Sequence, residues 1–284
     1  MRVALVTCAA YPDLTESDAL LADALRRRNH RVVALPWNGE TGRPELTDVA
    51  VLRSNWDYHD DLDRFLAWLV DVELAGTRVL NDPELVRWNF DKRYLVELAA
   101  KGIAVPRMVD APTSVESLES WFAETGCSTA VRKPAWGASG HLVDILRAGE
   151  SRSTDVLGVE AQDGRPFLVQ EFVDSISDGE HALVFFAGLL SHSFIRLPSP
   201  REFRVNSQYG GRVEATTAAP ELVHFAQRVL EALPSRPTYA RVDVVATAAG
   251  PVLMEVELNE PSLCLNLAED SADRFATAIC DVAQ

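Results

Sequence analysis

TYARVDVVATAAGPVLMEVELNEP, residues Thr238–Pro261, has the alternating pattern of a β-hairpin. Apolar and charged residues alternate on both sides of the turn TAAGP, so each strand has one dry face and one charged face. If the turn is symmetric about Ala249, Asp243 lies directly opposite Glu255. The hairpin is therefore expected to place two carboxylates against each other.

A third carboxylate, Glu257, lies two residues further along the same charged face, opposite Arg241. Directly opposed side chains on a sheet are roughly 5 Å apart at Cβ, and like charges there are destabilising unless a cation neutralises them. Mg²⁺ suits such a site because it takes one or two carboxylates and leaves its other positions to water and phosphate. The alternative is a solvated acidic face without an ion.

The composition limits the classes of function. The 284 residues are enough for two or three domains, and 27 basic against 42 acidic side chains give a formal charge of −15. Such an acidic chain is not expected to bind nucleic acid. Its four cysteines form no CxxC pair, which predicts no zinc site, no disulfide framework and a reducing cytoplasm. No apolar run is long enough to span a bilayer, so no membrane partner is expected.

Residues 1–82 are predicted to form an α/β domain, because four apolar segments alternate with helix patterns. The segments are 2–7, 31–35, 48–54 and 78–80. Ligands of a parallel sheet bind beyond the carboxyl ends of its strands, and the third strand ends there in a loop rich in polar and aromatic residues. We expect this loop to bind a small zwitterion, unless it is simply an exposed polar loop. The expected substrate contacts are Arg53, Trp56, Asp57 and Tyr58.

A second unit, residues 83–166, is predicted to begin with a helix at Pro83, because Asn and Asp precede this proline. The chain has three lysines against 24 arginines. A lysine kept against this bias indicates a need for a compact ammonium group, with chance retention as the alternative. One of them, Lys133, precedes the loop Gly137–Gly140, whose backbone N–H groups can approach a phosphate unless the loop is a plain turn.

The third unit, residues 167–284, opens with the apolar strand Phe167–Val173. The backbone at the end of such a strand offers the donor and the acceptor that the edge of adenine requires, and Glu180 can accept a ribose hydroxyl. A purely structural strand is the alternative. The loop Arg201–Gly211 has too little apolar content to pack, so its arginines are expected to face an anionic ligand unless the loop is only solvated.

The order of these features resembles that of the ATP-grasp ligases from about Asn81 onward. The shared features are a helix lysine after Asn-Asp-Pro, a Lys-Pro before a glycine loop, the hinge Gln-Glu-Phe-Val with an acid beyond it, and a terminal Asp…Glu-x-Glu hairpin. The resemblance implies an α/β fold, α+β in part. In this fold, a Rossmann-like parallel sheet at the N-terminus precedes two α+β subdomains that clasp ATP.

The resemblance also implies a set of site residues. The ATP phosphates would be held by Lys92 and Lys133 under a lid of Gly137, Ser139 and Gly140, the adenine by Gln170, Glu171, Phe172 and Val173, and the ribose by Glu180. Two Mg²⁺ ions, with Mn²⁺ as the alternative, would be bound by Asp243, Glu255 and Glu257, or by Asn259 in place of Glu257. The catalytic cations would be Arg241, Lys133 and Arg204, with Arg196, Asn206 and Gly210 near the substrate.

Two segments, Val51–His59 and Glu255–Leu263, are similar to those of a bacterial subgroup that includes D-cycloserine synthetase, an O-ureido-serine cyclo-ligase. This similarity implies that a small amino acid is activated as an acyl phosphate and closed into a ring by its own nucleophile. The alternatives are a two-substrate ligase, a kinase-like or hydrolytic use of ATP, and a non-catalytic ATP-binding module. The expected partner is a small amino-acid-like substrate. If the protein assembles, we expect a homodimer.

Overall fold

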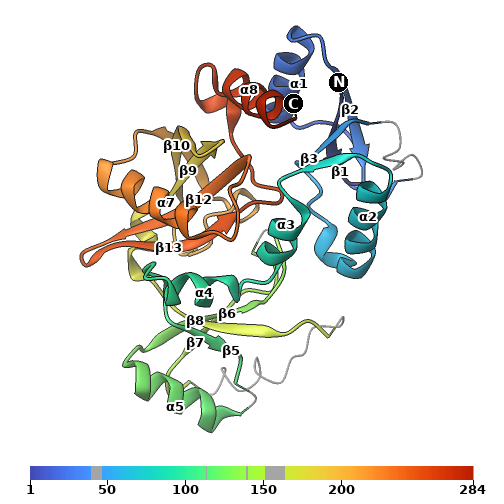
Figure 1. Cartoon of the computed structure of the whole chain (residues 1–284). Helices are drawn as coiled ribbons and strands as arrows, with labels where there is room; N and C mark the ends of the chain where they lie inside the picture. Colours follow the sequence, from blue (N-terminus) through green and yellow to red (C-terminus); the bar gives the residue numbers. More distant parts are fainter. Residues whose placement is uncertain (40–46, 113, 139, 151–163, 284) are drawn as a thin grey trace.

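The computed structural model describes residues 1–39, 47–112, 114–138, 140–150 and 164–283, and these residues form three sheets (Figure 1). The predicted glycine lid includes Ser139, which lies outside the described residues. Within the described part of the chain, every helix is too short or too polar to cross a membrane.

The N-terminal sheet is parallel, with the order β2-β1-β3-β4, as the sequence predicts. Its elements are β1 (Arg2–Thr7), α1 (Glu16–Arg27), β2 (Arg31–Pro36), β3 (Val49–Leu52), α2 (Leu62–Leu74) and β4 (Arg78–Leu80). Both faces of β1 are apolar, so one face packs under α1 and the other under α2. The loop that follows β3 contains a short 3₁₀ helix, η2 (Tyr58–Asp60).

The central sheet is antiparallel, with the order β5-β8-β6-β7. Its elements are β5 (Met108–Asp110), α5 (Val115–Thr125), β6 (Thr129–Pro134), β7 (Asp144–Arg147) and β8 (Phe167–Glu171). The apolar residues Leu118 and Phe122 of α5 pack on this sheet. The domain boundary predicted at residue 167 therefore falls inside a sheet, because β8 pairs with β5 and β6 rather than with later strands.

The C-terminal sheet has the order β11-β10-β9-β12-β13. Its strands are β9 (Glu180–Phe186), β10 (Leu189–Leu197), β11 (Arg212–Thr216), β12 (Tyr239–Thr247) and β13 (Gly250–Glu257). The predicted hairpin register is confirmed, since Asp243 pairs with Glu255 and Arg241 with Glu257. A shift follows Asp243, so that the next pair is Val244 with Leu253 and the turn is not symmetric about Ala249.

Helices cover both faces of the C-terminal sheet. One face carries α3 (Pro83–Phe90), α4 (Tyr94–Ala100) and α7 (Pro220–Ala232), and the other carries α8 (Ser271–Ala283). On α8, the ring of Phe275 stacks on Phe186 with centroids 4.5 Å apart. The same helix packs against α1, so it joins the C-terminal sheet to the N-terminal domain (Figure 1). The remaining 3₁₀ helices are η3 (Asp174–Asp178), η4 (Ser207–Tyr209) and η5 (Leu265–Leu267).

Asn81 connects the end of β4 to the hairpin. Its side-chain amide donates to the carbonyl oxygens of Tyr239 and Leu258, and its oxygen accepts from the backbone N–H of Thr238 and of Tyr239. Asn81 is 1% exposed, so these bonds are made inside the protein. A buried amide with all of these partners fixes the strand ends relative to each other.

Candidate active site

A cavity of about 680 Å³ lies where the three sheets meet. Its walls come from the hinge after β8, the glycine loop after β6, the charged face of the hairpin and the loops of the N-terminal domain. Cavities of this size, with apolar walls and a few converging polar groups, are typical of small-molecule sites.

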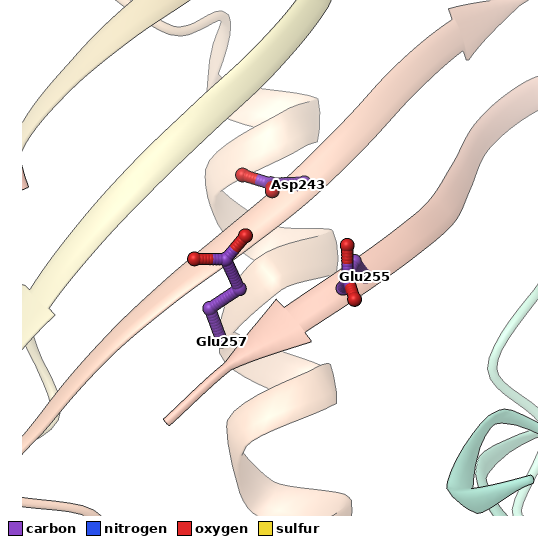
Figure 2. Close-up of side chains that lie close together, drawn as sticks. All are labelled: Asp243, Glu255 and Glu257. Carbon is purple, nitrogen blue, oxygen red and sulfur yellow. The ribbon is translucent and has the colours of Figure 1, made fainter. Parts of the chain in front are cut away.

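Three carboxylates of the hairpin lie close together (Figure 2), and two of them, Glu255 and Glu257, line this cavity. Asp243 of β12 and Glu255 and Glu257 of β13 each offer an oxygen, and these oxygens all lie within 4.8 Å of one another. Asp243 is fully buried, whereas the side chains of Glu255 and Glu257 are 33% and 27% exposed toward the cavity. An acidic hairpin face without a function would project into bulk solvent, so this placement favours the binding-site interpretation.

Two arginines hold the carboxylate of Asp243. Arg241 donates from Nε to Oδ1 at 2.9 Å and from Nη2 to Oδ2 at 2.8 Å, and Nη2 of Arg196 donates to Oδ2 at 2.6 Å. Arg241 also contacts Glu257, and Arg196 contacts Glu180. Charge-assisted bonds of this kind fix the direction of both guanidinium groups.

The electrostatics of the cluster differ from one carboxylate to the next. Burial, together with the negative charges of Asp243 and Glu255, raises the pKa of Glu257 to about 7 despite the opposing effect of Arg241. Burial acts in the same direction on Glu255, but Lys92 and Lys133 outweigh it and lower the pKa of this group. Of these two glutamates, Glu255, which contacts Lys92, is therefore the more firmly ionised.

The donor set fits a hard divalent cation. Three carboxylate oxygens at this spacing match the preference of Mg²⁺ for oxygen ligands, and the cavity leaves room for water and phosphate oxygens. Asn259 lies in the cavity wall and is 3% exposed, and both polar atoms of its side-chain amide are buried without a hydrogen-bond partner among the described residues. An orphaned amide beside the cluster agrees with a further oxygen ligand at this position.

Two of the three lysines, Lys92 and Lys133, line the cavity. Lys92 donates from Nζ to the carbonyl oxygen of Gly137 at 2.9 Å and lies 3.1 Å from Oε1 of Glu255. Burial, aided by Lys92, lowers the pKa of Lys133 to about 8, despite the opposing effect of Glu255. Lys101 bonds instead to the carbonyl oxygen of Ala232.

The predicted adenine residues Gln170, Glu171, Phe172 and Val173 all line the cavity. Gln170 is 3% exposed, and its Oε1 has no partner within the described residues. Glu171 is held by Arg107 through bonds of 2.7 and 2.8 Å, and this hydrogen bonding lowers the pKa of Glu171. Glu180, predicted to bind ribose, also lines the cavity, but Arg196 already pairs with it.

The loop after β3 contributes to the cavity only in part. Trp56 and Tyr58 line it, but Arg53 and Asp57 do not. Arg53 is 2% exposed and pairs with Asp18 at 2.8 Å. Asp57 accepts bonds from the side chains of Trp37 and Asn38, at 2.6 and 2.8 Å. The structure therefore does not support the prediction that these two charges grip the substrate in this cavity, because Asp57 is held within the N-terminal domain and Arg53 is held by Asp18 and by the carbonyl oxygen of Pro261.

The loop 201–211 contributes Arg204 and Asn206 to the cavity, but not Gly210. Glu202 accepts from Arg204 at 2.8 Å, and the guanidinium carbon of Arg204 lies 3.5 Å from the ring centroid of Tyr209. The hydroxyl of Tyr209 donates to the carbonyl oxygen of Gly140 at 3.2 Å, which joins this loop to the glycine loop. Gly210 has a φ of 81° in a tight turn, which explains the glycine without a role in binding.

Several cavity residues were not predicted from the sequence. Among them are Tyr11, His141, Glu260, Ser262 and Cys264. Glu260 follows the end of β13 by three residues. This position could have predicted a place in the cavity, because residues next to a strand end lie near the site that the strand forms. Tyr11 gave no such signal, since only the fold brings its loop to the hairpin.

The chain matches two protein families over separate segments. Residues 3–81 match "D-cycloserine synthetase DcsG, N-terminal domain", and residues 106–271 match "Prokaryotic glutathione synthetase, ATP-grasp domain".

Individual proteins show the same two relationships. The chain is 31% identical to "Cycloserine biosynthesis protein DcsG" of Streptomyces lavendulae, over 98% of each protein. It is also 31% identical to a glutathione synthetase of Synechococcus elongatus, over 64% of this chain and 56% of that protein. Among solved structures, D-cycloserine synthetase DcsG superposes over the full length of both chains with a TM-score of 0.87 and 29% identity.

Proposed function

The chain belongs to the ATP-grasp ligases, and from this premise we propose that it closes a ring within one small amino acid, as D-cycloserine synthetase does. Members of this family form C–N bonds at the expense of ATP. The observation that carries the finer proposal is the match to DcsG over 98% of both proteins, which includes the N-terminal domain. That domain supplies Trp56 and Tyr58 to the cavity. If the N-terminal domains of this chain and of DcsG contact the substrate in the same way, the two substrates should be related.

The first step would be activation of the substrate carboxylate. A carboxylate oxygen attacks the γ-phosphorus of ATP, the bond to ADP breaks, and an acyl phosphate forms. Lys92 and Lys133 lie where they can bind the transferring phosphoryl group and neutralise its charge. Asp243, Glu255 and Glu257, with Asn259 beside them, would hold Mg²⁺ (two ions, with Mn²⁺ as an alternative), which supplies further charge neutralisation.

The second step would be ring closure. A nitrogen of the same molecule attacks the acyl carbon, loses its proton, and inorganic phosphate leaves. Arg241 is held in one orientation by Asp243 and by the carbonyl oxygen of Ser262, and in our proposal this fixed charge would stabilise the developing oxyanion. Such a donor contributes about 3–4 kcal/mol to catalysis. Holding both reacting ends in one site makes the step intramolecular, an advantage of up to roughly 7–11 kcal/mol.

The acyl phosphate must be kept from water. The bond from Tyr209 to Gly140 and the bond from Lys92 to Gly137 place the glycine loop over the hairpin side of the cavity. We assign the loop the role of a lid that excludes water while the intermediate exists.

A second candidate, a two-substrate ligase, is favoured by one observation. The segment 106–271 matches the ATP-grasp domain of glutathione synthetases, whose name implies two joined substrates. A non-catalytic ATP-binding module is disfavoured because the carboxylates and both cavity lysines are retained. We keep a reducing cytoplasm as the proposed place of action and a homodimer as the proposed assembly.

The test uses one amino acid at a time. With ATP, Mg²⁺ and O-ureido-D-serine alone, we expect ADP and phosphate release and a cyclic product by mass spectrometry. Addition of a second amino acid should neither be required nor appear in the product. If phosphate release requires two amino acids and yields a linear dipeptide, the cyclo-ligase proposal is wrong and the two-substrate alternative holds.

A further inference from the structure

The loop from Glu260 to Cys264, which we call the carbonyl loop, is held by four different side chains. Its successive carbonyl oxygens accept one bond each. The donors are Trp56 Nε1 to Glu260 at 3.3 Å, Arg53 Nη2 to Pro261 at 2.9 Å, Arg241 Nη1 to Ser262 at 3.0 Å and His192 Nε2 to Leu263 at 2.7 Å. These donors come from the N-terminal domain and from two strands of the C-terminal sheet. The loop is therefore fixed from several sides, and its side chains have a defined place in the cavity wall.

The side chain of Glu260 lines the cavity from this loop. The other acids of the cavity wall are neutralised by the protein itself. Arginines pair with Glu171, Glu180 and Glu257, and Lys92 pairs with Glu255. Among the residues that the structure describes, no lysine or arginine forms an ion pair with Glu260. A cavity carboxylate without its own cation is suited to a cationic ligand.

The surroundings of Glu260 match an ammonium group. Tyr58 lines the same cavity as Glu260, and Nε1 of Trp56 donates to the backbone carbonyl oxygen of Glu260. The ring of Trp56 meets that of Tyr11 edge to face, with centroids 5.4 Å apart, and both rings line the cavity. Aromatic faces attract cations, and a fixed carboxylate binds an ammonium group by a charge-assisted hydrogen bond.

We propose that Glu260 binds the α-ammonium group of the substrate and thereby selects amino acids over carboxylic acids that lack the amine. The inference rests on the proposed function, because it takes the substrate to be a small amino acid whose carboxylate reacts while its α-amine does not. Trp56 and Tyr11 form the wall beside this group. Arg53 and His192 act as positioning residues, since they hold the loop without lining this cavity.

The test compares two ligands that differ only in the amine. Calorimetry in the presence of Mg²⁺ and a non-hydrolysable ATP analogue measures the affinity for O-ureido-D-serine and for its analogue with hydrogen in place of the α-ammonium group. A bond between charged groups is worth about 1.5–3 kcal/mol, or roughly 10- to 150-fold in affinity. Glu260→Gln should weaken binding of the amino acid by this factor and change binding of the analogue by less than about twofold.

Two controls separate this contact from a general effect. Glu269→Gln removes the same charge from an exposed position nearby and should leave both affinities unchanged. The affinity for ATP should be the same in wild type and in Glu260→Gln. Equal losses for both ligands in Glu260→Gln, no loss for either, or failure of the wild type to bind the amino acid would overturn the inference. Tight binding without a cyclic product would contradict the proposed function while the role of Glu260 stands.

Discussion

At the scale of single residues, the surroundings of Asp243 favour our proposal that the hairpin is a binding site rather than a stabilising element. Its carboxylate is fully buried beside two other acids, and two arginines are needed to hold it there. Buried charges with such partners contribute little net stability, because desolvation offsets the attraction between them. The cluster is better explained by the divalent cation that its oxygens fit.

The carboxylates should be required for turnover but not for folding. Asp243→Asn and Glu255→Gln keep the side-chain shape but remove the charge that binds Mg²⁺, so we expect both variants to lose at least 100-fold in kcat. Calorimetry should also show that the affinity for ATP no longer depends on Mg²⁺. Circular dichroism controls for the fold, and near-native turnover in both variants would remove the metal assignment.

The lysines allow a matched comparison. Lys133 lies in the cavity and Lys101 bonds to a backbone carbonyl outside it, so only Lys133→Ala should weaken ATP binding strongly, by about tenfold or more. Isothermal titration of ATP into both variants measures this. Equal affinities for the two variants would contradict the assignment of Lys133 to the phosphates.

The same lysine predicts a pH dependence. Because burial lowers the pKa of Lys133 to about 8, the free enzyme loses this positive charge as the pH rises through 8. The affinity for ATP should therefore fall between about pH 7.5 and 9, and the fall should be absent in Lys133→Arg, whose guanidinium stays charged. A titration at constant ionic strength checks this, and an identical fall in the variant would exclude Lys133 as its cause.

At the scale of elements, helix α8 joins the C-terminal sheet to α1. Phe275 is fully buried, stacked on Phe186 and in contact with the ring of Tyr239. Phe275→Ala should lower the free energy of unfolding by about 3–5 kcal/mol, because it leaves a cavity at this junction. Urea denaturation measures the loss. The control is Leu74→Ala at an 80% exposed position, for which we expect a change within about 0.5 kcal/mol, and equal effects would show that the junction adds no stability.

The elements also show what a sequence can and cannot predict. The pairing of Asp243 with Glu255 followed from local alternation, because side chains in a hairpin face each other according to strand period and turn. The sheet to which β8 belongs did not follow, since its partners β5 and β6 lie far away in the chain. The shift after Asp243 was equally hidden, because alternation continues on both sides of it.

At the scale of the whole molecule, the cavity exists only because three sheets meet. The direction of Arg53 depends on this arrangement. From its place in a polar loop, Arg53 was expected to face the substrate. Its guanidinium instead bonds to Asp18 of α1 and to the carbonyl oxygen of Pro261 in the protein interior. Neither partner can be identified from the loop itself. The cavity lysines and the hairpin carboxylates were proposed from sequence because neighbouring residues define their motifs. The residues that contact the substrate could not be proposed as well, because contacts with distant parts of the chain decide which side chains of the loop after β3 reach the cavity.

The central claim is that one molecule supplies both the carboxylate that is phosphorylated and the nucleophile that closes the ring. Its most direct test is oxygen transfer. O-Ureido-D-serine labelled with ¹⁸O in both carboxylate oxygens is turned over as the sole amino acid, and mass spectrometry follows the label. We predict one ¹⁸O in each released phosphate and one in the cyclic product, because the attacking oxygen leaves with the phosphate. Unlabelled phosphate, which hydrolysis of ATP by water would produce, would contradict the account.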